Sequence, residues 1–225
     1  VVPVERQQAA LARLGQMAAV VAHEVKNPLA GIKGAIQVLM SRRKGGDDEL
    51  PVMRDIVARI DTLSDLIQDL TTFARPRPPR LAVVSVRQLL DEALTTLRRD
   101  PISASLDIHV ECDDGTMTAD IEMMRSTLLN LLLNAAQAMH GQGRIDLVAG
   151  HHADVWTIEV RDSGPGIPPD LRDQVLEPFF TTKARGGGLG LPIAKRVAEL
   201  HRGTLDVLCP DGGGTTVRVR LPGQP

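Results

Sequence analysis

The proline-rich stretch ARPRPPR, residues 74–80, divides this chain into two parts that cannot share one helix. Each proline lacks a backbone N–H donor and biases the preceding residue toward an extended conformation, so helical structure must end here. Before this stretch, apolar residues recur every three or four positions, whereas beyond it alternating segments are mixed with helical ones. We therefore predict two domains, residues 5–74 and 83–222, joined by a semi-rigid linker at 75–82.

The first domain is predicted to be an all-α helical hairpin with one apolar stripe on each helix. The glycines and clustered charges of RRKGGDDELP, residues 42–51, indicate the turn between the helices. The stripe of the second helix comprises Met53, Ile56, Ile60, Leu63, Ile67 and Leu70. Because two helices with one stripe each cannot enclose a core, we expect two copies to form a four-helix bundle as a homodimer.

The second domain is predicted to be an α+β two-layer sandwich, because strand and helix patterns are interspersed with short turns. Helical patterns lie near residues 86–98, 120–140 and 191–201, and strand patterns near 106–111, 144–150, 154–162, 203–208 and 215–221.

Composition excludes several classes of protein. The chain has three Phe, one Trp and no Tyr, and its formal net charge is −2, so it offers neither stacking platforms nor a basic stripe for nucleic acid. No apolar run approaches the roughly 20 residues of a membrane-spanning helix, so we expect no membrane segment in this fragment. Cys112 and Cys209 lie far apart and suit free thiols in a reducing cytoplasm.

The stretch VVAHEVKNPLAGIKG, residues 20–34, places polar residues and a proline within the first helix. His23 points away from Val21 and Val25, toward solvent, and Asn27 shares its face. Pro28 should bend the helix within one turn of His23. Three interpretations stay open at this point: a surface histidine beside an incidental proline, a zinc site, or a nucleophilic histidine with Glu24 as its neighbouring carboxylate. The zinc site is disfavoured because His-Glu-x-x-His would require histidine at position 27.

A nucleotide site is indicated in the second domain, although the chain has no P-loop sequence. In LLNLLLNAAQAM, residues 128–139, Asn130 and Asn134 lie on one helical face. They are either a satisfied polar pair in the core or amide oxygens turned toward a hard cation or phosphate.

Two glycine-rich stretches add to this indication. In RDSGPGIPPD, residues 161–170, Asp162 ends a predicted strand, and Gly164 and Gly166 permit a close backbone approach. Any strand-end turn could share that pattern. In EPFFTTKARGGGLGLPIAKRV, residues 177–197, Gly188 and Gly190 precede a helix whose first turn suits an anion. Lys183 and Arg185 add positive charge, and a merely flexible loop would not explain the helix start.

Taken together and in this order, these stretches resemble the two-component sensor histidine kinases, closest in wording to the nitrogen-regulation type. HEVKNP is similar to the family's H box, NLLLNAAQAM to its N box, DSGPGIP to its G1 box, EPFFTTK to its F box and GGGLGL to its G2 box. GGGTTVRV, residues 212–219, resembles the last glycine box. The resemblance implies a dimerisation and phosphotransfer hairpin followed by an ATP-binding domain of the Bergerat fold.

The resemblance also implies a role for each residue of the hairpin site. His23 would accept the phosphoryl group, Glu24 would be its general base, and Asn27 would position water when the protein dephosphorylates its partner. That partner would be the receiver domain of a response regulator, which accepts the phosphoryl group on an aspartate.

For the second domain, the resemblance implies ATP and Mg²⁺ as the bound groups. Asn134 would be the Mg²⁺ ligand, Asn130 would lie near the phosphates, and Asp162 would accept from the adenine amino group. Backbone at Gly164, Gly166, Gly188 and Gly190 would approach the nucleotide, with Lys183 on the phosphate side and Thr215 on the adenine side.

Two features depart from the usual family pattern. Gln137 stands where many members have Lys or Arg, which leaves one cationic phosphate contact in doubt. The segment from Phe180 to Gly186 is a short lid, so nucleotide exchange should be fast. The alternatives are an ATPase of the gyrase or Hsp90 class, which would not need the histidine hairpin, and a mainly phosphatase or scaffold regulator.

Overall fold

The computed structural model describes residues 25, 29–40, 50–74, 76–183, 187–210 and 212–223. The chain forms two compact units, Val1–Arg77 and Pro78–Pro225. In the described part of the chain, no helix combines the length and the apolar character needed to cross a membrane.

The first unit contains helical residues 29–40 and the 25-residue helix α2, Leu50–Ala74. Lys33 forms an ion pair with Asp61, so the two helices contact each other. Ile60 is buried, but several apolar side chains of both helices remain exposed within this single chain: Ile32, Val38, Leu39, Val52, Ile56 and Leu63. The predicted helical character of this unit is confirmed.

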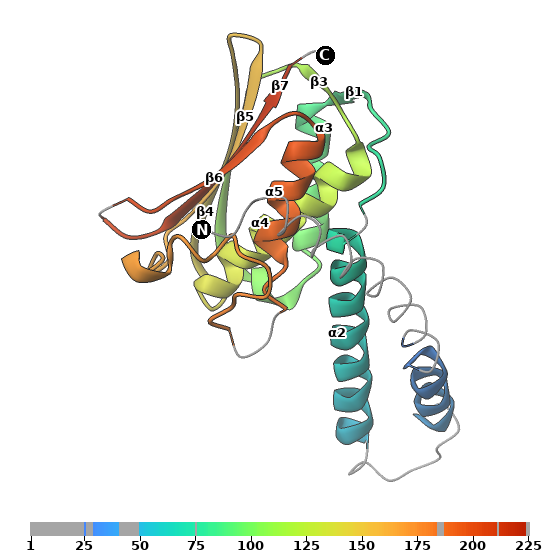
Figure 1. Cartoon of the computed structure of the whole chain (residues 1–225). Coiled ribbons are helices and arrows are strands. Elements are labelled where there is room, and N and C mark those ends of the chain that lie inside the picture. The colour runs from blue at the N-terminus through green and yellow to red at the C-terminus, as the bar shows by residue number, and fades with distance from the viewer. Residues whose placement is uncertain are drawn as a thin grey trace, which may run out of the picture. The chain divides into compact units, whose positions relative to one another are not determined.

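The second unit is built on a five-stranded mixed sheet with the order β2-β4-β5-β7-β6. The strands are β2 Ser105–Cys112, β4 Gln142–His152, β5 Val155–Asp162, β6 Thr204–Leu208 and β7 Thr215–Pro222. β2 and β4 are parallel, and the other neighbours are antiparallel. The helices α3, Val86–Leu97, α4, Ile121–Ala138, and α5, Gly190–Leu200, lie over one face of the sheet (Figure 1). The predicted two-layer α+β architecture is confirmed.

A small second sheet was not predicted. β1, Ala82–Ser85, pairs with β3, Thr116–Ala119, in an antiparallel ribbon. Each strand has only four residues: β1 shows no alternation of apolar and polar positions, and the alternation of β3, with Met117 and Ala119 buried, is too short to stand out from the sequence. The first short 3₁₀ turn, Pro101–Ser103, follows α3, and the second, Pro169–Leu171, follows β5.

The core lies between the sheet and the three helices. Both α3 and α4 carry fully buried residues, α3 contacts α4, α4 contacts β4 and β5, and Trp156 of β5 is 1% exposed. Polar side chains fix the starts of two helices: Ser85 accepts a hydrogen bond from the backbone N–H of Gln88 at α3, and Asp120 accepts one from that of Met123 at α4. These caps and the apolar contacts hold α4, which carries the residues of the candidate site, against the sheet.

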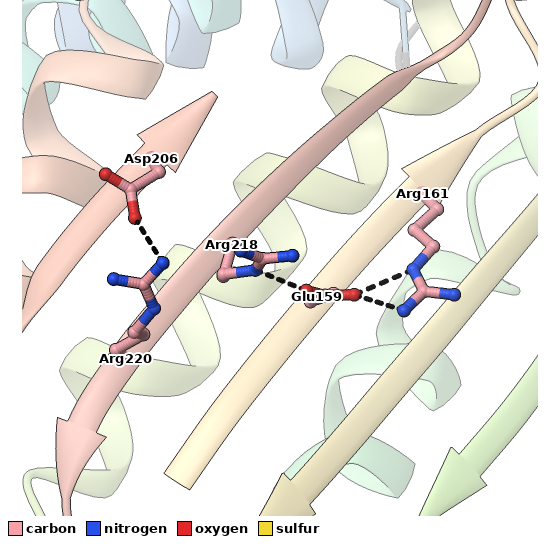
Figure 2. Close-up of polar contacts among 5 residues, drawn as sticks. All are labelled: Glu159, Arg161, Asp206, Arg218 and Arg220. Carbon is pink, nitrogen blue, oxygen red and sulfur yellow. Dashed lines mark hydrogen bonds and ion pairs between the residues drawn. The ribbon is translucent and has the colours of Figure 1, made fainter. Parts of the chain in front are cut away.

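The opposite face of the sheet carries a network of charges. Because side chains alternate along a strand, Glu159 points away from the core face that its buried neighbours Ile158 and Val160 occupy. Figure 2 shows Glu159 between Arg161 and Arg218, with Arg220 paired to Asp206 on the next strand. Burial alone would raise the pKa of Glu159, but hydrogen bonds from both arginines hold that pKa below its ordinary value.

Candidate functional site

Helix α4 forms the backbone of the candidate site. Asn130, Asn134 and Ala138 follow one another at intervals of one helical turn, and all three are half-buried. The two amides therefore lie at the edge of the core and not inside it, which removes the interpretation of a polar pair enclosed in the core.

The carboxylate of Asp162 lies at one end of this site. Asp162 ends β5 and is the cross-strand partner of Thr215 on β7, so the sheet register brings them together. Asp162 Oδ1 accepts from the backbone N–H of Gly164 at 2.9 Å and from that of Thr215 at 3.2 Å. Burial raises the pKa of Asp162 above its ordinary value, although hydrogen bonds from Gly164 and Thr215 act in the opposite direction.

Glycines allow the chain to fold closely around Asp162. Gly166, at φ +75°, would place a Cβ atom 3.0 Å from the carbonyl oxygen of Gly214. Gly214, at φ +80°, would place one 2.3 Å from the carbonyl oxygen of Asp162. Gly214 ends the glycine run at 212–214, and only its place in that run marked it in the sequence. A side chain at either position would be strained and would displace the backbone.

The same helix connects this end to a second cluster at the start of α5. A Cβ at Gly164 would lie 3.8 Å from the Ala138 Cβ, so the C-terminal turn of α4 abuts the Asp162 loop. One turn earlier, a Cβ at Gly190 would lie 3.3 Å from Asn134 Nδ2 and 3.9 Å from the Asn130 side chain. The absence of a side chain at Gly190 thus lets the first turn of α5 approach both amides.

The loop before α5 is fixed by its own backbone contacts. Gly188 has φ +64°, and a Cβ there would lie 2.5 Å from the carbonyl oxygen of Phe180. The backbone N–H of Phe179 donates to the carbonyl of Gly188 at 3.1 Å. Among the described residues no side chain caps the start of α5, so the backbone N–H groups of Gly190 and Leu191 have no side-chain acceptor there and suit an anion.

Lys183 joins the second cluster from the loop. Its Nζ donates to Asn134 Oδ1 at 2.9 Å and to Gln137 Oε1 at 2.7 Å. Desolvation of the ammonium lowers the pKa of Lys183. The ammonium of Lys183 therefore lies against α4 beside Gln137, whose own side chain is neutral.

The residues present fit a magnesium ion that is held together with a nucleotide. In the described part of the chain, no group of three or more His, Cys, Asp or Glu side chains could hold a metal ion alone. A single amide oxygen from Asn134 suits Mg²⁺, which takes most of its ligands from water and phosphate. The contact with Lys183 shows that this oxygen is directed toward a cation.

Several predicted site residues lie outside the described residues. They are His23, Glu24, Asn27 and Arg185, together with Pro28 and the last part of the short lid, residues 184–186. Their roles, and the bend expected at Pro28, stay predictions.

Sequence profiles of two domain families match this chain. The His Kinase A (phospho-acceptor) domain matches residues 13–79, and the histidine kinase-, DNA gyrase B- and HSP90-like ATPase matches residues 119–225. The signal transduction histidine-protein kinase AtoS of Escherichia coli is 36% identical over 96% of this chain. The chain spans 36% of the length of AtoS, about a third.

Solved structures of histidine kinases also match this chain. A mycobacterial sensor histidine kinase, MprB, is 31% identical, with a TM-score of 0.58, and the match covers 64% of this chain and 99% of that one. Full-length ShkA in complex with AMPPNP is 25% identical, with a TM-score of 0.80, over 92% of this chain and 45% of its own.

Proposed function

Because this chain belongs to the sensor histidine kinases, we propose that it is a protein-histidine kinase core that phosphorylates His23 with ATP. The phosphoryl group would then pass to an aspartate on the receiver domain of a response regulator. The observation that carries this proposal is the convergence on α4 of the Asp162 carboxylate, two amides and an uncapped helix start.

The two ends of the site suit the two ends of ATP. Asp162 would accept a hydrogen bond from the adenine amino group, whereas guanine would present a carbonyl oxygen to the carboxylate. The uncapped N–H groups of α5, Asn130 and Lys183 would contact the phosphates. Asn134 would hold Mg²⁺, which when bound neutralises charge on the phosphates.

The hairpin would supply the acceptor. A neutral ring nitrogen of His23 would attack the γ-phosphorus, so an N–P bond forms while the bond to the ADP oxygen breaks. Glu24 would orient the ring and accept the proton from its other nitrogen. In the reverse role, Asn27 would position a water molecule that hydrolyses the phosphorylated receiver, which would make the protein a phosphatase of its partner as well.

The exposed apolar side chains of the first unit support a homodimer. Ile32, Leu39 and Val52 are each more than half exposed in the single chain, and a second hairpin would cover such residues in a four-helix bundle. The free thiols of Cys112 and Cys209 favour a reducing compartment, the cytoplasm.

The experiment is incubation of the chain with Mg²⁺ and γ-labelled ATP, wild type beside His23→Gln. Acid-labile, alkali-stable label that requires His23 is the expected result. Consumption of ATP without label on the protein would instead indicate an ATPase. If the protein neither takes up label nor consumes ATP, the kinase proposal fails, and a scaffold or phosphatase role takes its place.

A further inference from the structure

The contact that the family resemblance did not anticipate is the one between Lys183 and Gln137. Gln137 lies one turn after Asn134 on α4, and both side-chain oxygens accept from the same ammonium, at 2.7 and 2.9 Å. Within the described residues, no carboxylate forms an ion pair with Lys183. Its positive charge is therefore held in place without being neutralised.

This arrangement is unusual for a surface lysine. An ammonium on a flexible stem is normally strongly hydrated, and holding it still costs side-chain entropy. Here two neutral acceptors on one helix face fix its position near the start of α5. An ammonium that is fixed in place and has no carboxylate partner is suited to bind an anionic ligand between α4 and α5.

We propose that Gln137 is a positioning residue, which holds the ammonium of Lys183 over α4 so that the loop supplies the cationic phosphate contact. This inference rests on the proposed function, since the anion is the triphosphate of ATP. Position 137 then needs no charge of its own, because its amide oxygen places a cation that another segment carries.

The site residues also indicate how this contact changes when nucleotide binds. Asn134 Oδ1 cannot bind Mg²⁺ and Lys183 Nζ closely at the same time without placing two cations side by side. Loading of the site would therefore release Lys183 from Asn134. The hydrogen bond to Gln137 can persist, and it would keep the ammonium within reach of the phosphate oxygens.

The competing explanation is that Gln137 is an exposed residue with an incidental hydrogen bond. Surface contacts of that kind contribute little, and Gln137→Met would then leave nucleotide binding unchanged. The two explanations therefore differ in equilibrium affinity, which can be measured without kinase activity.

The test is the dissociation constant of a nonhydrolysable ATP analogue with Mg²⁺, measured by titration for the wild type and several variants. Lys183→Gln should weaken binding by about 10-fold, the loss of roughly 1.4 kcal/mol from a charged contact. Gln137→Met should weaken it by about 3- to 10-fold. Gln88→Met on α3, which removes an exposed glutamine contact outside the site, is the matched control and should have no effect.

The decisive variant exchanges the two side chains, Gln137→Lys with Lys183→Gln. It keeps one ammonium and one amide at this place, so it should regain most of the affinity that Lys183→Gln loses. Equal melting temperatures for the variants would exclude unfolding as the cause.

If the wild type binds but Gln137→Met binds equally well, or the exchange restores nothing, Gln137 has no positioning role. If the wild type binds no ATP analogue, the proposed function fails first, and this inference falls with it.

Discussion

At the scale of single residues, the protonation of Asp162 should make ATP affinity depend on pH. Burial raises its folded pKa, so the carboxylate becomes protonated at a higher pH than an exposed aspartate. ATP affinity should therefore fall as the pH is lowered through this raised value. Titration of ATP binding against pH checks this, and an affinity that stays constant down to the range of exposed carboxylates would contradict it.

The substitution Asp162→Asn separates binding from stability. The amide would present donors to the adenine amino group, so ATP affinity should drop by about 10- to 100-fold, as expected for a lost hydrogen bond to a charged group. Because the folded pKa is raised, the carboxylate costs stability once the pH rises above its unfolded value. Asp162→Asn should therefore melt no lower than the wild type at neutral pH. A lower melting temperature would show that the carboxylate is needed for folding.

At the scale of elements, the charge network on the open face of the sheet predicts how stability depends on pH. Glu159, with a side chain only 6% exposed, bridges β5 and β7 through Arg161 and Arg218 (Figure 2). Its depressed folded pKa means that the stabilisation is complete above the unfolded value and is lost as pH falls through the folded one. Glu159→Gln should thus cost about 1–3 kcal/mol at neutral pH.

Denaturant unfolding of both proteins at several pH values measures this difference. The gap between wild type and Glu159→Gln should close as the pH falls below the pKa range of ordinary glutamate. Arg196→Gln, which removes an exposed pair with Glu199 on α5, is a suitable control because both side chains are largely exposed. A gap that is the same at acidic and neutral pH would show that Glu159 contributes by packing and not by its charge.

The helices and strands also show which parts of the fold and of the site could be predicted from the sequence. The helices and long strands of the second unit were predictable because their apolar periodicity is strong over many residues. The ribbon of β1 and β3 was not, since four-residue strands carry too little pattern. At the site, the two asparagines were identifiable from their spacing, and Asp162 only from the resemblance of its loop to the family's G1 box. The contact of Lys183 with Gln137 was not, because 46 residues separate the two and only the fold brings them together.

At the scale of the whole molecule, the hairpin should control assembly. Ile56 and Leu63 of α2 are partly exposed and lie on the predicted dimer stripe. Replacing both with glutamate should convert a dimer into a monomer in sedimentation equilibrium, because charges would be buried at the interface. Val83→Glu, on the ribbon of the second unit, should leave the dimer intact. A wild-type chain that sediments as a monomer would contradict the four-helix bundle.

The central claim joins the two units in one reaction: ATP held by the site on α4 phosphorylates His23. The most direct measurement is mass-spectrometric mapping of the phosphate, under non-acidic conditions, after incubation with Mg²⁺ and ATP. We predict one added phosphate on the peptide that contains His23, little with GTP, and much less with Asp162→Asn when ATP is kept below the wild-type dissociation constant. Phosphate on any other residue, or a chain that consumes ATP and stays unmodified at His23, would contradict the account.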